Sequence, residues 1–171
     1  MIQIKRHSEL VGPEKDIIDK MAAVAFEGVT IVQNTVWSTP DWCVINYQDQ
    51  EIAMYFNVVE RLVSFDGLLL KVAGINNVIT QPAFQGKNFA SSTLKHSEEF
   101  LFKTLKASYA LLLCGDELVD FYSKLGWRLT RAKLLVHQPG IGEMNWASNT
   151  MLLNPIPYTD PKLINLNGLP W

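Results

Sequence analysis

The residues best suited to binding an anion follow a predicted strand and open a predicted helix between Val78 and Leu94, VITQPAFQGKNFASSTL. The first backbone N–H groups of a helix are unpaired, and the helix dipole favours negative charge there. Gly86 allows the backbone to approach a ligand closely, Lys87 adds a positive charge, and Ser91 and Ser92 add hydroxyls. This combination suits a pyrophosphate. An ordinary strand, turn and helix with one glycine is the alternative.

Two common phosphate motifs are absent from the sequence. It contains no GxxxxGK[ST], and the GxGxxG spacing fails because Phe84 and Asn88 stand where glycines are needed. Kinases, P-loop NTPases and dinucleotide-dependent oxidoreductases are therefore disfavoured.

Length and composition limit the other possibilities. The 171 residues suit one domain, and 48% are hydrophobic, enough for a sizeable core. Fifteen Lys and Arg against seventeen Asp and Glu give no basic excess for nucleic acid, and no apolar run approaches the ~20 residues of a membrane span. Cys43 and Cys114 form no CxxC, so buried free thiols without a metal are expected. We expect a cytoplasmic protein, because no signal peptide is recognisable.

Hydrophobic patterning predicts the elements that must position these residues. The predicted strands are 2–4, 42–47, 52–65, 68–80, 109–114, 127–137 and 150–153, and the predicted helices are 12–28, 90–106 and 117–125. Residues 28–41 and 138–149 are predicted loops, and the first has room for one short helical turn. Apolar spacing gives the first helix a buried face of Ile17, Ile18, Met21, Ala22, Ala25 and Phe26.

The order of these elements predicts an α/β (α+β) fold with a mixed, mostly antiparallel central sheet flanked by helices. Asp66-Gly67 between two long apolar runs indicates a hairpin. Gly74 within the second run marks either a bulge or a close backbone approach. We expect one domain over residues 1–153, with residues 154–171 as an extended arm packed on it.

The anion-binding segment resembles the acetyl-CoA signature of the GNAT N-acetyltransferase superfamily, Q/R-x-x-G-x-G/A. Gln85 matches its first position and Ala90 its last, while Asn88 replaces the central glycine. Asparagine tolerates positive φ better than most residues, so the turn is expected to persist. Residues 121–127, FYSKLGW, are similar to the helix-to-strand signature Y-x-x-x-G-F/W of the same superfamily. Relatives often carry a pantetheine-contacting Asn where this sequence has Gly115.

Within the superfamily, the chain is most similar to the branch of aminoglycoside 2′-N-acetyltransferases and nodulation N-acyltransferases. This resemblance rests on Phe84-Gln85-Gly86, Leu125-Gly126-Trp127 and the ending LINLNGLPW at residues 163–171. It implies an acyl-CoA donor, a small-molecule amine acceptor and possible pairing as a homodimer.

The resemblance also implies roles for particular residues. Tyr122 is expected to be the general acid for the leaving thiolate, and the Val78 N–H to hold the thioester oxygen. Packing on the sheet is the alternative for Tyr122. The implied contacts of coenzyme A are Val78, Ile79, Thr80, Gln85, Gly86, Lys87, Asn88, Phe89, Ala90 and Ser91.

The general base is not identified by the sequence. Glu60 is the nearest acidic candidate, although a solvated strand residue is the simpler interpretation. His137, at a strand end, is a weaker candidate, His96 is expected on the surface, and deprotonation through water is equally plausible.

Loops are expected to build the acceptor site, because the sheet is used for the donor. Carboxylates beside aromatic rings suit a cationic amine or an aminosugar, while core packing is the alternative for each tryptophan. The carboxylate of Trp171 joins the site if the tail folds back, and fraying is the alternative. The candidates are Trp37, Asp41, Trp42, Glu60, Glu143, Trp146 and Trp171.

Three functions remain open at this point. The first is an acetyl-CoA-dependent N-acetyltransferase for a primary amine of a small molecule. The second is a non-catalytic GNAT-like module for binding coenzyme A or a partner, which Asn88 and Gly115 favour and Tyr122 opposes. The third is an N-acyltransferase with a longer acyl donor.

Overall fold

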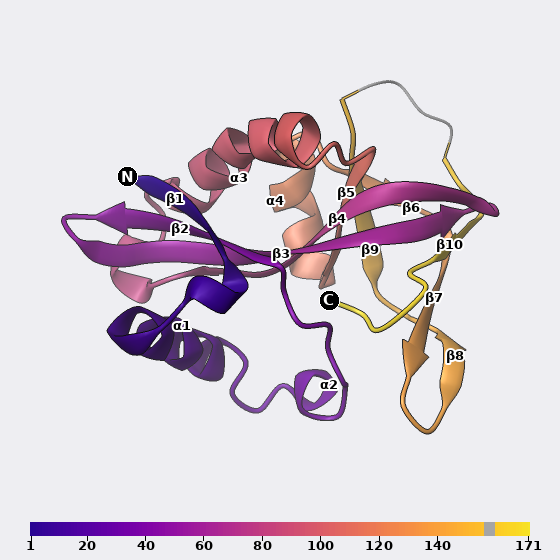
Figure 1. Ribbon diagram of the computed structural model, residues 1–171, viewed down its shortest axis with the longest axis horizontal. Helices are drawn as coiled ribbons and strands as arrows, with labels where there is room; N and C mark the ends of the chain where they lie inside the picture. The colour runs from indigo at the N-terminus through magenta and orange to yellow at the C-terminus, as the bar shows by residue number, and fades with distance from the viewer. Residues whose placement is uncertain (156–159) are drawn as a thin grey trace.

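The computed structural model describes residues 1–155 and 160–171 and shows one strongly twisted sheet between two helical layers (Figure 1). The sheet runs in the order β6-β9-β5-β4-β3-β10-β7-β8, and β2 pairs with both β3 and β1. Among the described strands, only β4–β5 and β10–β7 are parallel, so the predicted mixed, mostly antiparallel sheet is confirmed. The strands are β1 (Ile2–Arg6), β2 (Trp42–Gln48), β3 (Glu51–Phe65), β4 (Leu68–Thr80), β5 (Tyr109–Cys114), β6 (Arg128–Thr130), β7 (Lys133–Gln138), β8 (Gly142–Asn145), β9 (Asn149–Leu153) and β10 (Leu163–Asn165).

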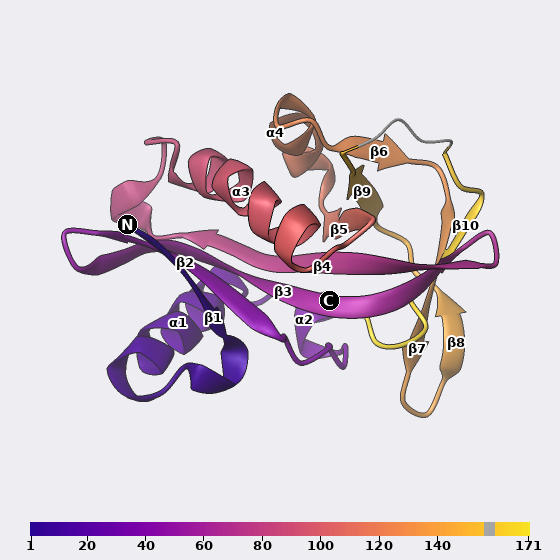
Figure 2. The same ribbon diagram turned by 45° about the horizontal axis from the view of Figure 1, so that its top comes forward.

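The helices lie on opposite faces of this sheet, as Figures 1 and 2 agree. One face carries α3 and α4, and the other carries α1 and α2. Their bounds are α1 (Gly12–Ala25), α2 (Thr30–Gln33), α3 (Phe89–Glu99) and α4 (Val119–Lys124), with short helices η1 (His7–Glu9), η2 (Pro82–Phe84), η3 (Phe100–Thr104) and η4 (Asp116–Leu118).

The long β3–β4 hairpin forms the spine of the molecule, and its turn is the predicted Asp66-Gly67. Because β3 is 15 residues long, one of its edges serves two neighbours: β2 pairs with its first half and β10 with Ser64 and Phe65. In its central part, the even-numbered residues Met54, Phe56 and Val58 pack beneath α3, and the odd-numbered residues Tyr55 and Val59 face α1 and the C-terminal tail.

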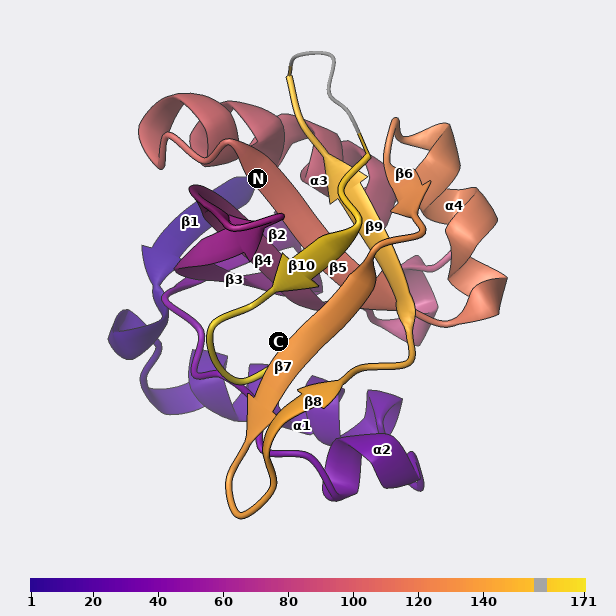
Figure 3. The same cartoon turned by 90° about the vertical axis from the view of Figure 1, so that its right-hand side faces the viewer.

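Two sequence predictions about the C-terminal half are wrong. The predicted strand 127–137 is two strands, because β6 pairs with β9 whereas β7 pairs with β8 and β10. The Thr130 hydroxyl stabilises the break by accepting the Ala132 N–H at 3.1 Å. The predicted loop 138–149 also contains β8, which forms a hairpin with β7 that projects from the body (Figure 3).

The described end of the C-terminal tail, residues 160–171, contains a strand in addition to extended chain. It contributes β10, which joins the sheet between β3 and β7. Arg61 then holds the tail, donating to the Leu169 carbonyl at 2.6 Å, and the Ser38 N–H donates to the Pro170 carbonyl at 2.8 Å. Residues 163–171 therefore fold back and pack against the sheet.

The first helix is less buried than its periodicity predicts. Ile18 is buried, whereas Ile17 and Ala25 of the predicted face are exposed. The reason is that α1 stands over the end of β4 and leaves a groove below it. On the other face of the sheet, the helix that follows β4 has the buried face that its sequence predicts. Leu94 and Ser97 of α3 and Leu101 of η3 are buried there.

Candidate functional site

The strand β4 separates from β5 in the middle of the sheet. The two strands pair only from Val72 to Ile75 on β4, although β4 continues to Thr80 along β3. Beyond Ile75, one edge of β4 therefore has no neighbouring strand among the residues that the structure describes. The gap that results is where an extended ligand can hydrogen-bond to the β4 backbone.

A β-bulge lies at this point. Tyr55 pairs with Ile79 and Asn57 with Asn76, so β4 carries one more residue than β3 in this interval. Asn77 adopts the left-handed conformation at φ 52°, and Val78 follows it. A bulge re-aims backbone N–H groups and side chains. The bulge begins two residues beyond Gly74, where the sequence predicted either a bulge or a close backbone approach.

Gly74 is the close approach. A Cβ on Gly74 would lie 2.1 Å from Cε2 of Trp171, whose indole covers this strand. The Trp171 side chain is buried, and its Nε1–H donates to the Leu111 carbonyl of β5 at 3.1 Å. The indole of Trp171 thus covers the part of the sheet where β4 pairs with β5.

The turn after β4 keeps the geometry that the sequence predicts. Gly86 has φ +72° with open space around its Cα, and Asn88 has φ 62° immediately before α3 begins at Phe89. The Gln85 side chain donates to the Thr80 carbonyl at 3.2 Å and ties the turn to β4. The first N–H groups of α3 face this exposed turn, as an anion site requires.

Lys87 and the serines contribute less directly. Lys87 Nζ donates to the Ala83 carbonyl at 2.9 Å and lies 5.7 Å from the Phe84 ring centroid, so its charge folds back on η2. Ser92 donates to the Phe89 carbonyl. The backbone N–H groups at the start of α3 are therefore the groups of this turn best placed to bind an anion.

Tyr122 lies on α4, in the cluster beneath α3. Its side chain is 5% exposed and contacts the rings of Phe121 and Trp127. Its hydroxyl makes no hydrogen bond among residues 1–155 and 160–171. Burial, and secondarily the neighbouring Cys114, raises the pKa of Tyr122, so the phenol stays protonated over the neutral range. Cys114 and Cys43 are both buried free thiols, as predicted.

Gly115 leaves space that another side chain occupies. A Cβ on Gly115 would lie 2.4 Å from the Glu117 carboxylate. The Glu117 side chain therefore stands where a side chain at position 115 would begin.

Three of the four predicted acceptor tryptophans, Trp37, Trp146 and Trp171, fall into one cluster with the tail, whereas Trp42 packs edge to face against Phe100 on the α3 side of the sheet. The Trp37 and Trp146 rings meet edge to face at 5.7 Å, and both pack in the cluster that contains Trp171. These tryptophans can pack in the core and also form the wall of a site, because Trp37 remains partly exposed.

The predicted carboxylates do not gather with these rings. Glu60 lies beneath α3, where it accepts from Trp42 Nε1 at 2.6 Å and pairs with Lys71 at 2.8 Å. Burial opposes its ionisation, but the hydrogen bonds from Lys71 and Trp42 outweigh burial and lower the pKa of Glu60. Asp41, which immediately precedes β2, accepts the Glu60 N–H of the neighbouring strand β3 at 2.7 Å.

The remaining polar candidates are exposed. Glu143 on β8 accepts from Asn165 Nδ2 at 2.7 Å. His137 pairs in register with it on β7, and His96 lies on the solvent face of α3. None of these side chains is brought to the bulge of β4.

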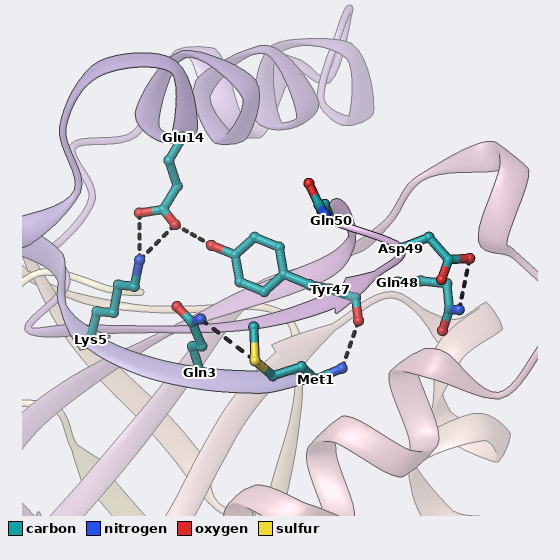
Figure 4. Close-up of a pocket in the computed structure, with 8 residues that line it drawn as sticks. All are labelled: Met1, Gln3, Lys5, Glu14, Tyr47, Gln48, Asp49 and Gln50. Carbon is teal, nitrogen blue, oxygen red and sulfur yellow. Dashed lines mark hydrogen bonds and ion pairs between the residues drawn. The ribbon is translucent and has the colours of Figure 1, made fainter.

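A groove of about 800 Å³ opens between α1, the β2–β3 turn and the end of β4. Thr80 and Gln85 line it, together with Ile17 and Val24 of α1, which are 43% and 62% exposed. A second cavity, of about 520 Å³, lies next to it at the N-terminus. Figure 4 shows its centre, where Glu14 joins Lys5, at 2.7 Å, to the Tyr47 hydroxyl. The second cavity is therefore lined by groups that already satisfy one another.

Sequence reasoning missed three polar groups near the bulge. The hydroxyl of Tyr55 and the Oδ1 atoms of Asn57 and Asn76 are buried with no hydrogen-bond partner among the described residues. The signal was available, because Asn57 interrupts an apolar run at a position that strand alternation buries.

Comparison with known proteins places this geometry in a known fold. No family model and no curated protein matches the sequence. An Escherichia coli GNAT-family N-acetyltransferase, YhbS, solved with CoA, superposes with a TM-score of 0.67 at 15% identity, covering 97% of this chain and 88% of that one. Escherichia coli ElaA superposes with a TM-score of 0.62 at 17% identity, and the match covers 89% of this chain and 97% of ElaA. A GNAT-family acetyltransferase from Brucella melitensis, solved with acetyl-CoA, superposes with a TM-score of 0.57 at 13% identity. That match covers 96% of this chain and 94% of the Brucella protein.

These likenesses confirm the predicted fold: the chain has the GNAT fold over nearly its whole length. The more specific branch stays a prediction. None of the helices in the described part of the chain combines the length and apolarity needed to cross a bilayer.

Proposed function

We propose that this protein is an acetyl-CoA-dependent N-acetyltransferase that acts on a primary amine of a small molecule, with an aminosugar as one candidate acceptor. One observation carries the proposal. β4 loses its β5 partner after Ile75, bulges at Asn76–Val78 and leads into a turn with Asn88 in the left-handed conformation before α3. The free strand edge suits an extended pantetheine arm, and the turn suits the pyrophosphate at its end.

The residues present fit this donor. The backbone of Val78, Ile79 and Thr80 would bind the pantetheine arm along the free edge of β4. The turn at Gln85, Gly86, Lys87 and Asn88, with the N–H groups of Phe89, Ala90 and Ser91, would bind the pyrophosphate. The open space around Gly86 leaves room for a phosphate to approach. The donor supplies an activated acyl thioester.

Acyl transfer then requires little of the protein besides positioning and hydrogen bonds. The lone pair of the amine forms the C–N bond while the Val78 N–H holds the carbonyl oxygen. The electrons of the C–S bond move to sulfur, which takes a proton from the buried Tyr122 hydroxyl. The amine nitrogen releases one proton to water, and the solvent returns one proton to Tyr122. The products are an amide and a free thiol, and the phenol is restored.

The cluster of Trp37, Trp146 and Trp171 is the proposed wall of the acceptor site. Its position on the α1 face of the sheet, beside the gap of β4 and β5, supports this role. Asp41, Glu60 and Glu143 are engaged in the bonds described above, so direct contact with an acceptor would require them to leave those bonds.

Thermal stabilisation by coenzyme A and acetyl-CoA tests the proposal. At 100 times Kd, either ligand should stabilise the protein by about 2.7 kcal/mol, which a thermal melt measures easily. Amine-dependent release of thiol from acetyl-CoA should accompany binding. Absence of both effects would leave the non-catalytic interaction module as the better explanation. Stabilisation without amine-dependent release would support a module that only binds coenzyme A.

A longer acyl donor is the second candidate, and the groove below α1 favours it. The groove reaches Ile79 and Thr80 from the α1 side, and its exposed apolar residues Ile17 and Val24 suit an alkyl chain. The same melt with a long-chain acyl-CoA decides between the donors. Stabilisation greater than that by acetyl-CoA, lost on Val24→Glu, would identify the groove as an acyl site.

Asn88→Gly is expected to tighten coenzyme A binding. Glycine adopts positive φ without the steric cost of a side chain, so the variant relieves up to ~1 kcal/mol of backbone strain and clears space above the turn. The measurement is Kd for coenzyme A by titration calorimetry. Asn167→Gly is the matched control, because Asn167 has φ 53° in the tail, remote from this turn. Weaker binding by Asn88→Gly would show that the Asn88 side chain itself contacts the ligand.

A further inference from the structure

Two asparagines face each other across the spine of the sheet with their carbonyl oxygens unsatisfied. Asn57 of β3 and Asn76 of β4 are direct register partners, and Asn57 is 4% exposed. Neither Oδ1 has a hydrogen-bond partner within residues 1–155 and 160–171. Leaving a buried acceptor unsatisfied is destabilising. Two such groups at one place are what a ligand with two N–H or O–H donors would satisfy.

Strand alternation places both side chains on the acceptor side of the sheet. Phe56 and Val58, the neighbours of Asn57, pack beneath α3, so Asn57 faces the opposite side. That side carries the cluster with Tyr55 under α1 and the cluster with Trp171 under the tail. The asparagines lie on the strands between these two clusters, and the Tyr55 hydroxyl is likewise unsatisfied among the described residues.

The pair is also adjacent to the proposed reaction centre. Asn76 is the first residue of β4 beyond the segment paired with β5, and it opens the bulge that contains Val78. On its other side, Gly74 is covered by the Trp171 indole. A group bound to the asparagines would therefore lie between the Trp171 ring and the backbone that would hold the thioester.

We infer that Asn57 and Asn76 together bind the nucleophilic –NH2 group of the acceptor and select primary amines. The inference rests on the proposed function. Opposed residues of antiparallel strands have Cβ atoms ~5 Å apart, so one nitrogen can lie within ~2.9 Å of both oxygens. A neutral primary amine donates one N–H to each oxygen and keeps its lone pair for the C–N bond. A secondary amine or an alcohol has one such hydrogen and leaves one oxygen unsatisfied.

The experiment compares primary amines with their one-hydrogen analogues. Benzylamine and glucosamine are the probes, each against its N-methyl derivative, with benzyl alcohol as a third acceptor and acetyl-CoA as donor. For at least one probe, wild-type kcat/KM should favour the primary amine by about tenfold or more. Asn57→Leu and Asn76→Leu should lower kcat/KM for the primary amine by about 10- to 100-fold and remove the preference.

Stability provides a second readout. Asn57→Leu should keep or raise Tm, because it removes an unsatisfied oxygen, and should keep the stabilisation by acetyl-CoA. Asn46→Leu is the matched control: Asn46 is also a buried strand asparagine, but its Nδ2 donates to Thr93 at 2.7 Å beneath α3. That control should lower Tm and leave the amine preference unchanged.

The outcomes separate this inference from the proposed function. Normal stabilisation by acetyl-CoA, combined with an unchanged amine preference in both Leu variants, overturns the inference alone. The inference also falls if the wild type uses neither primary amine, or if Asn57→Leu loses as much Tm as Asn46→Leu. A wild type that acetyl-CoA does not stabilise overturns the proposed function and the inference with it.

Discussion

Tyr122→Phe is expected to lower kcat by about 10²- to 10⁴-fold while leaving stabilisation by acetyl-CoA unchanged. The hydroxyl makes no hydrogen bond within the described part of the chain, so the fold does not depend on it. The ring contacts with Phe121 and Trp127 persist in phenylalanine. The measurement is thiol release under saturating donor and amine, together with a thermal melt with and without acetyl-CoA.

Tyr109→Phe provides the matched control for this prediction. Tyr109 begins β5, at the opposite end of that strand from Cys114, which neighbours Tyr122. The Tyr109 ring packs 4.7 Å from that of Phe65, and the loss of its hydroxyl should leave kcat unchanged. A Tyr122→Phe enzyme with the wild-type rate would remove the general-acid assignment.

The pH profile gives a further check on Tyr122. Burial raises its pKa above the ordinary value of 10, and a group is protonated below its pKa. The proton donor is therefore fully present from pH 6 to 10, and the rate should rise as the acceptor amine loses its proton and then stay level to about pH 10. A fall between pH 8 and 10 that Tyr122→Phe lacks would contradict a raised pKa.

Gly74→Ala is expected to destabilise the protein by about 3 kcal/mol, the upper end for overpacking, which for a chain of this size lowers Tm by about 6–12 °C. The new Cβ would lie 2.1 Å from the Trp171 ring. The ring cannot withdraw without lengthening its 3.1 Å hydrogen bond to the Leu111 carbonyl. Acceptor use should fall with stability, because the displaced ring is part of the proposed wall. Denaturant unfolding measures the free energy.

A double-mutant cycle isolates the contact that causes this loss. Trp171→Ala alone should cost about 3–5 kcal/mol, the usual range for truncating a buried tryptophan. Gly74→Ala should cost almost nothing further in that background, because no ring remains to collide with. Additive losses would show that the Trp171 ring does not lie over Gly74 in solution.

The sequence alone determined the features that depend on neighbours along the chain. Turn residues located the β3–β4 hairpin, because Asp-Gly favours the positive φ that a tight turn needs. Hydrophobic spacing identified α3 and its buried face. The tolerance of asparagine for the left-handed conformation correctly predicted that the turn would survive at Asn88.

Tertiary structure alone decided the features that depend on distant segments. Residues 127–137 form two strands because β6 pairs with β9 at one end of the strand order and β7 pairs with β10 towards the other end. Glu60 is withdrawn from the acceptor side because the parity of β3 turns it towards α3, and Trp171 covers Gly74 because β10 returns the tail to the sheet. The pairing of Asn57 with Asn76 depends on hairpin register and on a one-residue bulge. Local sequence preferences specify neither the strand register nor the docking of the tail, because both are fixed by the burial of whole surfaces.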